Sequence, residues 1–149
     1  MKIYLGADHA GFELKNKLRE HLEKAGYKVE DVGAHELDPE DDYPHYAYTV
    51  ASKVLGDDQP DAKGILVCGS GQGMAIAANR VGGIRAAVIW SEEGARETRQ
   101  DNDSNVLALP ARMIDETTAL KITDAWLKEP FSGADRHQRR LDELERIYG

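Results

Sequence analysis

The sequence predicts an α/β fold: a single doubly wound (Rossmann-like) five-stranded parallel sheet with helices on both faces and a C-terminal helix. Short apolar segments alternate with longer amphipathic segments along the chain, which is typical of strand–helix repeats around a parallel sheet. Some of the short segments are apolar at every position, as in strands covered on both faces. The chain has 149 residues, the usual length of one domain, so residues 1–149 are expected to form one unit.

Five segments have the composition of short, buried strands. The third of them, Gly-Ile-Leu-Val-Cys, is the most continuous apolar run, and the first ends at a glycine, Gly6. Such runs of three to six residues bounded by glycine or polar residues favour strands over helices. The expected strands are residues 3–5, 27–32, 64–68, 86–90 and 106–109.

Six longer segments have helical periodicity. In the first, Leu14, Leu18 and Leu22 recur every four residues and share one face, so Lys15 and the other charged residues should mostly point away from the core. Gly26 stands where a helix usually ends, and Pro44 is tolerated in the first turn of the second helix. The expected helices are residues 13–24, 44–54, 74–79, 92–100, 115–128 and 136–148.

Composition excludes several classes of protein. Lys and Arg number 19 against 27 Asp and Glu, a net charge of −8 that argues against a nucleic-acid partner. No apolar run approaches the roughly 20 residues of a membrane helix, and no secretory leader is recognisable at the start. The single cysteine, Cys68, excludes an intramolecular disulfide and a cysteine-built metal cluster. These features predict a cytoplasmic protein without a membrane partner.

Ligands of doubly wound sheets bind beyond the carboxyl ends of the strands. This rule directs attention to Gly6–His9 after the first strand, to 68–73 after the third, and to 101–105 before the fifth. The middle segment, Cys-Gly-Ser-Gly-Gln-Gly, joins a buried strand to a helix. Its glycines let the backbone approach an anion closely, although the same loop could equally be a tight turn without a ligand. Its spacing matches neither the dinucleotide fingerprint nor a P-loop.

Two other groups of residues could carry chemistry. Cys68 faces a helix start, which stabilises a reactive thiolate, but a lone free cysteine is more often a small buried hydrophobe. Asp8 and His9 either face the ligand crevice or begin the next helix. Arg136 and Arg140 lie one helical turn apart and could bind one phosphate together, or they form an ordinary solvated helix surface.

Taken together, these segments resemble ribose-5-phosphate isomerases of type B, within the wider sugar-phosphate isomerase family that includes galactose-6-phosphate isomerase subunits. The resemblance extends over essentially the whole chain. It implies a doubly wound fold, a homodimer (possibly a tetramer) with the active site at the interface, a sugar-phosphate substrate, and neither metal nor nucleotide cofactor. It is carried by Gly6–Phe12, Asp42–Pro44, Cys68–Gly73, Ala77–Asn79, Gly83–Ala86, Asn102–Val106 and Arg136–Arg140.

The resemblance also implies roles for single residues. Cys68 matches the base of the cysteine branch, because Met74 stands where the other branch has a catalytic glutamate. The thiolate would move a proton from C2 to C1 of the open-chain aldose through a cis-enediolate, and Ser70 would help to move a proton between the oxygens. The substrate-binding residues that it implies are Asp8, His9, Tyr43, Asn102, Arg112, Arg136 and Arg140, with the backbone N–H groups of Gly69, Gly71 and Gly73 around the developing negative charge.

One position departs from the family pattern. Asp101 stands where a histidine commonly helps to open the furanose ring, and an aspartate is ordinarily a poor acid near neutral pH. Either Asp101 acts in catalysis in a protonated form, or His9 takes over ring opening, or the substrate is a different sugar. The alternatives to ribose 5-phosphate isomerisation are therefore an isomerase of a six-carbon sugar phosphate, such as allose or galactose 6-phosphate, and a non-catalytic sugar-phosphate-binding module.

Overall fold

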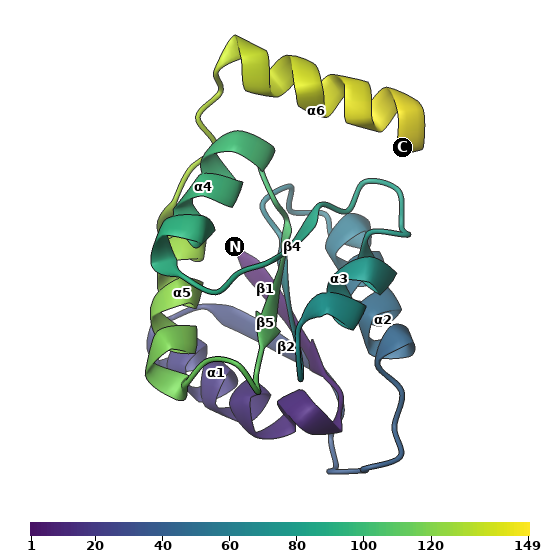
Figure 1. Cartoon of the computed structure of the whole chain (residues 1–149), viewed down its shortest axis with the longest axis vertical. Helices are drawn as coiled ribbons and strands as arrows, with labels where there is room; N and C mark the ends of the chain where they lie inside the picture. Colours follow the sequence, from purple (N-terminus) through teal and green to yellow (C-terminus); the bar gives the residue numbers. More distant parts are fainter.

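Five parallel strands form one sheet in the order β2-β1-β3-β5-β4 (Figure 1). The computed structural model describes every residue from Met1 to Gly149. All five predicted strands are confirmed, although β4 is shorter than expected, because Ile89 and Trp90 lie beyond it. The strands are β1 (Lys2–Ala7), β2 (Lys28–Gly33), β3 (Lys63–Cys68), β4 (Ala86–Val88) and β5 (Val106–Pro110).

Helices cover both faces of the sheet, as predicted for a doubly wound fold. In Figure 1, α1, α4 and α5 lie on one side of the strands and α2 and α3 on the other, while α6 projects beyond these layers next to the end of α4. A short 3₁₀ turn, η1 (His9–Gly11), precedes α1. The α-helices are α1 (Phe12–Lys24), α2 (Tyr43–Gly56), α3 (Gln72–Ala78), α4 (Glu92–Asn102), α5 (Glu116–Lys128) and α6 (Asp135–Tyr148).

The side chains of β3 alternate between two hydrophobic cores. Ile65 and Val67 pack with α1, α4 and α5, whereas Leu66 and Cys68 pack with α2 and α3. All six residues of β3 are buried, so the two-residue repeat of a strand supplies both layers at once. As a result, Cys68 leaves the sheet on the side of α2 and α3.

Lys15 differs from its predicted orientation. Its side chain is 1% exposed, and its Nζ lies 2.8 Å from both carboxylate oxygens of Asp31 on β2 and also donates to the carbonyl of Ala34. Arg19 supports the same carboxylate at 3.3 Å. Periodicity placed Lys15 away from the leucine face of α1, but it could not show that an edge strand with an acidic residue covers that flank.

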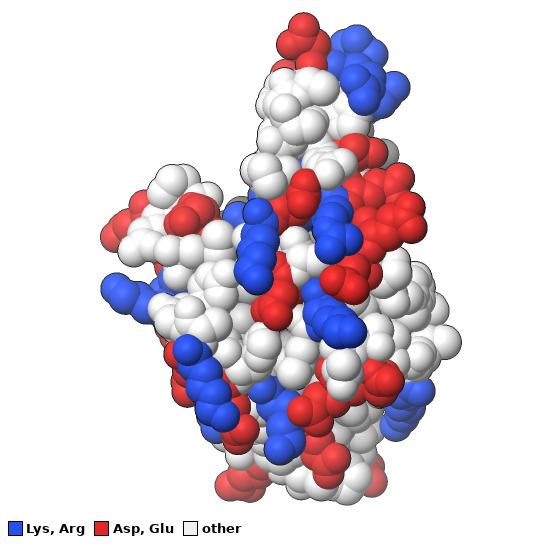
Figure 2. Space-filling view, turned by 90° about the vertical axis from the view of Figure 1, so that its left-hand side faces the viewer, with Lys and Arg blue, Asp and Glu red and all other residues white.

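Charges of both signs are interspersed on the face formed by α1, α4 and α5, where Figure 2 shows no continuous basic surface. This distribution agrees with the net charge of −8, and it lacks the basic stripe that nucleic-acid-binding surfaces present. None of the helices is long and apolar enough to cross a membrane.

The buried Lys15–Asp31 pair should contribute strongly to stability. Lys15→Met removes the cation but leaves Asp31 nearly buried, and such a change typically costs about 3–5 kcal/mol. Urea unfolding followed by circular dichroism measures the loss. Lys17→Met, on the exposed side of the same helix, should change the free energy of unfolding by less than about 0.5 kcal/mol. Equal stabilities of the two variants would show that the pair contributes nothing.

Candidate active site

The carboxyl ends of β1 and β3 meet at a cavity of about 390 Å³. The two strands are neighbours in the sheet and run in the same direction, so the segments that follow them emerge side by side. Most of the predicted site residues lie here. The lining residues are Asp8, His9, Ala10, Tyr43, Cys68, Gly69, Ser70, Gly73, Arg112 and Met113.

Cys68 is the last residue of β3 and lies at the wall of this cavity, only 4% exposed. The backbone N–H of Gly71 donates to its sulfur, with 3.2 Å between Gly71 N and Cys68 Sγ. Gly71 reaches this position with a φ of +73°, in the left-handed region that favours glycine. This contact and the end of β3 together fix the position of the sulfur at the cavity wall.

The glycine loop lets two side chains approach its backbone. Gly73 lies under the ring of Tyr43, and a Cβ at this position would come within 2.8 Å of that ring. Arg112 is held on the other side, because its backbone N–H donates to the carbonyl of Gly69 at 2.9 Å. An aromatic ring and a guanidinium therefore flank the loop. In contrast to the expected boundary, α3 already begins at Gln72, so Gly73 belongs to the helix.

Asp8 and His9 follow β1 and form the opposite wall. One oxygen of Asp8 accepts the N–H groups of Ala10 and Gly11 at 3.0 and 3.2 Å, so this residue both begins η1 and faces the cavity. His9 Nδ1 lies 2.8 Å from Asp41 Oδ1. This hydrogen bond raises the pKa of His9 above its ordinary value; burial opposes the shift, the charge of Asp8 favours it, and Arg112 opposes it.

Asp8, His9 and Asp41 place one possible ligand atom each within 4.8 Å of one another. Asp41 accepts hydrogen bonds from the backbone and ring of His9 and from Tyr46. Burial alone would raise the pKa of Asp41, but these hydrogen bonds lower it overall. Hydrogen bonding accounts for the clustering of the three residues, and we assign no metal to them.

Most of the remaining predicted residues lie around a second cavity, of about 530 Å³, between α6 and the segment before β4. Asp101, Asn102 and Arg140 line it, whereas Arg136 lines neither cavity. His137 faces Asp101, with 3.2 Å between Nδ1 and Oδ1, but the pair lacks hydrogen-bond geometry and Nδ1 is buried without a partner. Half-buried Asp101 therefore has an imidazole beside it, although its own position holds none.

The two cavities lie at opposite ends of the strands. This corrects the expectation that residues 101–105 would lie beside the carboxyl ends. Asn105 immediately precedes β5, and its carbonyl accepts from Gly64 N at the start of β3, at 2.9 Å. This segment therefore lies at the amino end of β3, whereas Cys68 lies at the carboxyl end of that strand. Within one chain, Cys68 and Asp101 do not share a site.

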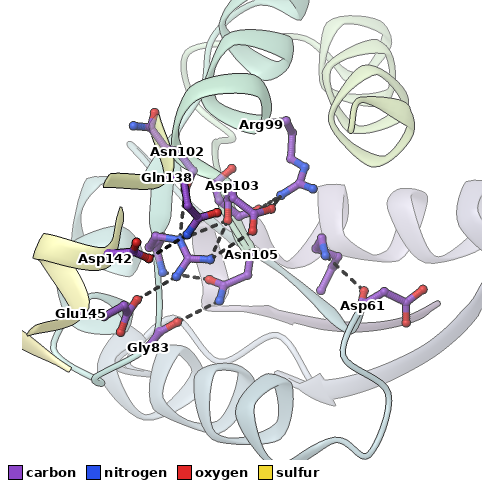
Figure 3. A network of polar contacts seen from close by, with 12 residues as sticks. Asp61, Gly83, Arg99, Asn102, Asp103, Asn105, Gln138, Asp142 and Glu145 are labelled. Atoms are coloured by element: carbon purple, nitrogen blue, oxygen red, sulfur yellow. Dashed lines mark hydrogen bonds and ion pairs between the residues drawn. The ribbon is translucent and has the colours of Figure 1, made fainter. Parts of the chain in front are cut away.

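Arg85 lines the second cavity, and Figure 3 shows the polar network that contains its partners Asn102, Asp103 and Glu145. Its guanidinium donates to the carbonyls of Asn102 and Asp103, each at 3.0 Å, and to Glu145 on α6 at 2.8 Å. These contacts join the end of α4 to the last helix and keep Asn102 and Arg140 on the same cavity. No role could be assigned to Arg85 from the sequence, because the partners of its guanidinium come from two distant segments, residues 102–103 and α6.

Asp41 and Met113 were also missed as site residues. Asp41 belongs to an acidic stretch with Glu36, Asp38, Glu40 and Asp42, and nothing in the sequence distinguishes it from these neighbours. Only the fold shows that Asp41 reaches His9. Met113 follows Arg112 and lines the Cys68 cavity, but an isolated methionine gives no signal of such a place.

The chain matches the family described as Ribose/Galactose Isomerase over residues 3–144. Among its relatives, ribose-5-phosphate isomerase B of Mycolicibacterium paratuberculosis is 45% identical over 144 residues, which is 97% of this chain and 89% of the relative. The Escherichia coli ribose-5-phosphate isomerase B is 43% identical over 146 residues, 98% of this chain and 95% of the relative.

Solved structures agree with these relatives. Ribose-5-phosphate isomerase B of Clostridium thermocellum is 43% identical, with a TM-score of 0.93 over 99% of this chain and 97% of that one. The Mycoplasma genitalium enzyme, solved with bound ribulose-5-phosphate, is 41% identical, with a TM-score of 0.93 over 98% and 95% of the two chains. Sequence and fold therefore agree over almost the full length, and the chain belongs to the ribose/galactose isomerase family, in its ribose-5-phosphate isomerase B branch.

Proposed function

We propose that the chain interconverts ribose 5-phosphate and ribulose 5-phosphate, with Cys68 as the base. The observation that carries this proposal is the sulfur of Cys68 at the carboxyl end of β3, with the Gly71 N–H 3.2 Å away and Arg112, Asp8 and His9 around the same cavity. The names of the relatives support the substrate. A coupled assay over five- and six-carbon aldose phosphates tests it, and a preference for allose or galactose 6-phosphate would contradict it.

The reaction moves two protons and two electrons along the sugar: one proton passes from C2 to C1 and one from O2 to O1. The Cys68 thiolate removes the C2 proton of the open-chain aldose, and the C–H electrons form the C1–C2 double bond of a cis-enediolate. The same thiol then protonates C1 while the carbonyl forms at C2. Ser70, half-buried at the cavity, assists the proton exchange between the O1 and O2 oxygens.

The negative charge of the enediolate needs hydrogen-bond donors that are already in place. In the glycine loop, the Gly71 N–H bonds the sulfur and the Gln72 N–H bonds Ser70 Oγ. The N–H groups of Gly69, Ser70 and Gly73 are the donors that we assign to the oxyanion. Asp8, His9 and Tyr43 would hold the sugar hydroxyls, and Arg112 would bind the phosphate.

We further propose that two copies of the chain complete each site. The second cavity, with Asp101, Asn102 and Arg140, lies at the amino ends of the strands. Only a second copy of the chain can therefore bring these residues to Cys68. The projection of α6 beyond the layers of the fold (Figure 1) and the exposure of Leu144, Ile147 and Tyr148 on it support this arrangement. Arg136, also exposed on α6, would reach the phosphate in the same way.

Cys68→Ala should abolish proton transfer. Removing the base should lower kcat by roughly 10³-fold or more, while the small, buried side chain leaves the fold intact. Proton exchange at C2 in D₂O, followed by NMR, measures the step directly, and thermal unfolding checks the fold. Exchange by the variant at the unmodified rate would exclude Cys68 as the base.

Mixing two impaired variants should restore activity if the site is shared. Arg140→Glu should raise KM for ribose 5-phosphate, because it places a negative charge at the phosphate. Refolded together with Cys68→Ala, it should yield dimers with one intact site, and activity should recover to about a quarter of the unmodified level at statistical mixing. Arg139→Glu, next to it on α6 but outside the cavity, is the matched control and should stay active alone. No recovery in the mixture would place each site within one chain.

Asp101→His should accelerate turnover of cyclic ribose 5-phosphate by roughly tenfold, because an imidazole can act as both acid and base at neutral pH. Erythrose 4-phosphate, which stays open-chain because its O4 carries the phosphate, should show no gain. Stopped-flow assays of both enzymes on both sugars measure the difference. A slower reaction with ribose 5-phosphate would show that Asp101 does not limit ring opening.

A further inference from the structure

We propose that Asp41 is a positioning residue for His9: it holds a proton on Nδ1 and turns Nε2 toward the Cys68 cavity. This inference rests on the proposed function only for what Nε2 meets there. Asp41 lies in the loop between β2 and α2, and it is separated from His9 by 32 positions in the sequence. None of the roles assigned to the site above includes it.

The contact is built from both the backbone and the ring of His9. Asp41 Oδ1 lies 2.9 Å from His9 N and 2.8 Å from His9 Nδ1, and Asp41 Oδ2 accepts from the Tyr46 hydroxyl at 3.2 Å. The Asp41 carboxylate is 5% exposed, against 32% for the His9 side chain. A carboxylate held by three donors has little freedom to move, so it fixes the plane of the imidazole.

The consequence is chemical as well as steric. A carboxylate accepts hydrogen bonds and cannot donate one when ionised, so Nδ1 must carry the proton. In neutral His9 the lone pair is then on Nε2, and in charged His9 the Nε2–H is a donor. Asp41 thus makes Nε2 the nitrogen that is protonated and deprotonated beside the substrate.

The groups around His9 determine the pH at which Nε2 loses its proton. Asp8 and Asp41 favour the cation, whereas Arg112 and burial oppose it, and the pKa of His9 is raised overall. Stabilisation from the pair is therefore lost as the pH rises through the folded-state pKa of His9, and it is also lost in acid as the pH falls through the lowered pKa of Asp41. The titratable groups around His9 are Asp8, Asp41, Tyr43, Tyr46, Cys68 and Arg112.

Asp41→Asn tests the charge while keeping the shape of the side chain. The neutral amide should let Nε2 lose its proton at lower pH, which ¹⁵N NMR of the His9 ring detects without any substrate. KM for ribose 5-phosphate should rise roughly tenfold near neutral pH, as for the loss of one charge-assisted hydrogen bond, with a smaller change in kcat. Glu40→Gln, the exposed neighbour whose side chain makes no polar contact, is the matched control and should leave both measurements unchanged.

A double-variant cycle separates positioning from a purely structural role. In a His9→Gln background, Asp41→Asn should add almost nothing to KM, because the group through which Asp41 acts is gone. Additive losses would overturn the proposal, as would an unchanged His9 titration in Asp41→Asn. Failure of the unmodified enzyme to isomerise ribose 5-phosphate would instead refute the proposed function, while the NMR titration would still decide whether Asp41 controls His9.

If Asp41→Asn unfolds, Asp41→Glu keeps the charge and lengthens the side chain. The His9 ring should then retain its cationic form at higher pH than in the Asn variant but lose the fixed orientation, so that KM rises with little change in the titration. A KM and a titration both equal to those of the unmodified protein would show that the placement of the carboxylate is unimportant, and would also overturn the proposal.

Discussion

The complete burial of β3 is the constraint on which the rest of the structure depends. Its six residues divide between two cores, and it pairs with β1 on one side and β5 on the other. Because such a strand cannot shift by one residue without exchanging its faces, the position of Cys68 is set by hydrophobic packing along the whole strand. The reactive group is thus placed by residues that take no part in chemistry.

Most of the fold could be predicted from periodicity alone. Short apolar runs predicted the five strands, and apolar residues at every third or fourth position predicted the six helices. The predicted bounds differ from the structure only at the ends of elements, for example at Ile89 and Gln72. Lys15 shows the limit of this approach. A helical repeat describes one face of one element, whereas the environment of Lys15 comes from Asp31 on another element.

Only part of the site could be predicted from the sequence, again because contacts between distant elements leave no local pattern. Cys68 and its loop form a local pattern, so their place at a strand end follows from the order of the elements. Asp101 and Asn102 precede β5 rather than follow a strand. The direction of β5 therefore places them at the amino ends of the strands, opposite to Cys68. The distance in space between Asp41 and His9 depends on how a loop of acidic residues returns to β1, which no local pattern encodes.

That returning loop has a consequence for binding. Residues 34–42 are held at one end by Lys15 and by Ala7, whose carbonyl accepts from Ala34 N at 2.8 Å, and at the other by His9. A connection pinned at both ends loses its conformational entropy when the chain folds rather than when a ligand arrives. The wall of the cavity is therefore preorganised, and an ammonium group buried beneath α1 contributes to the affinity of a site that it never touches.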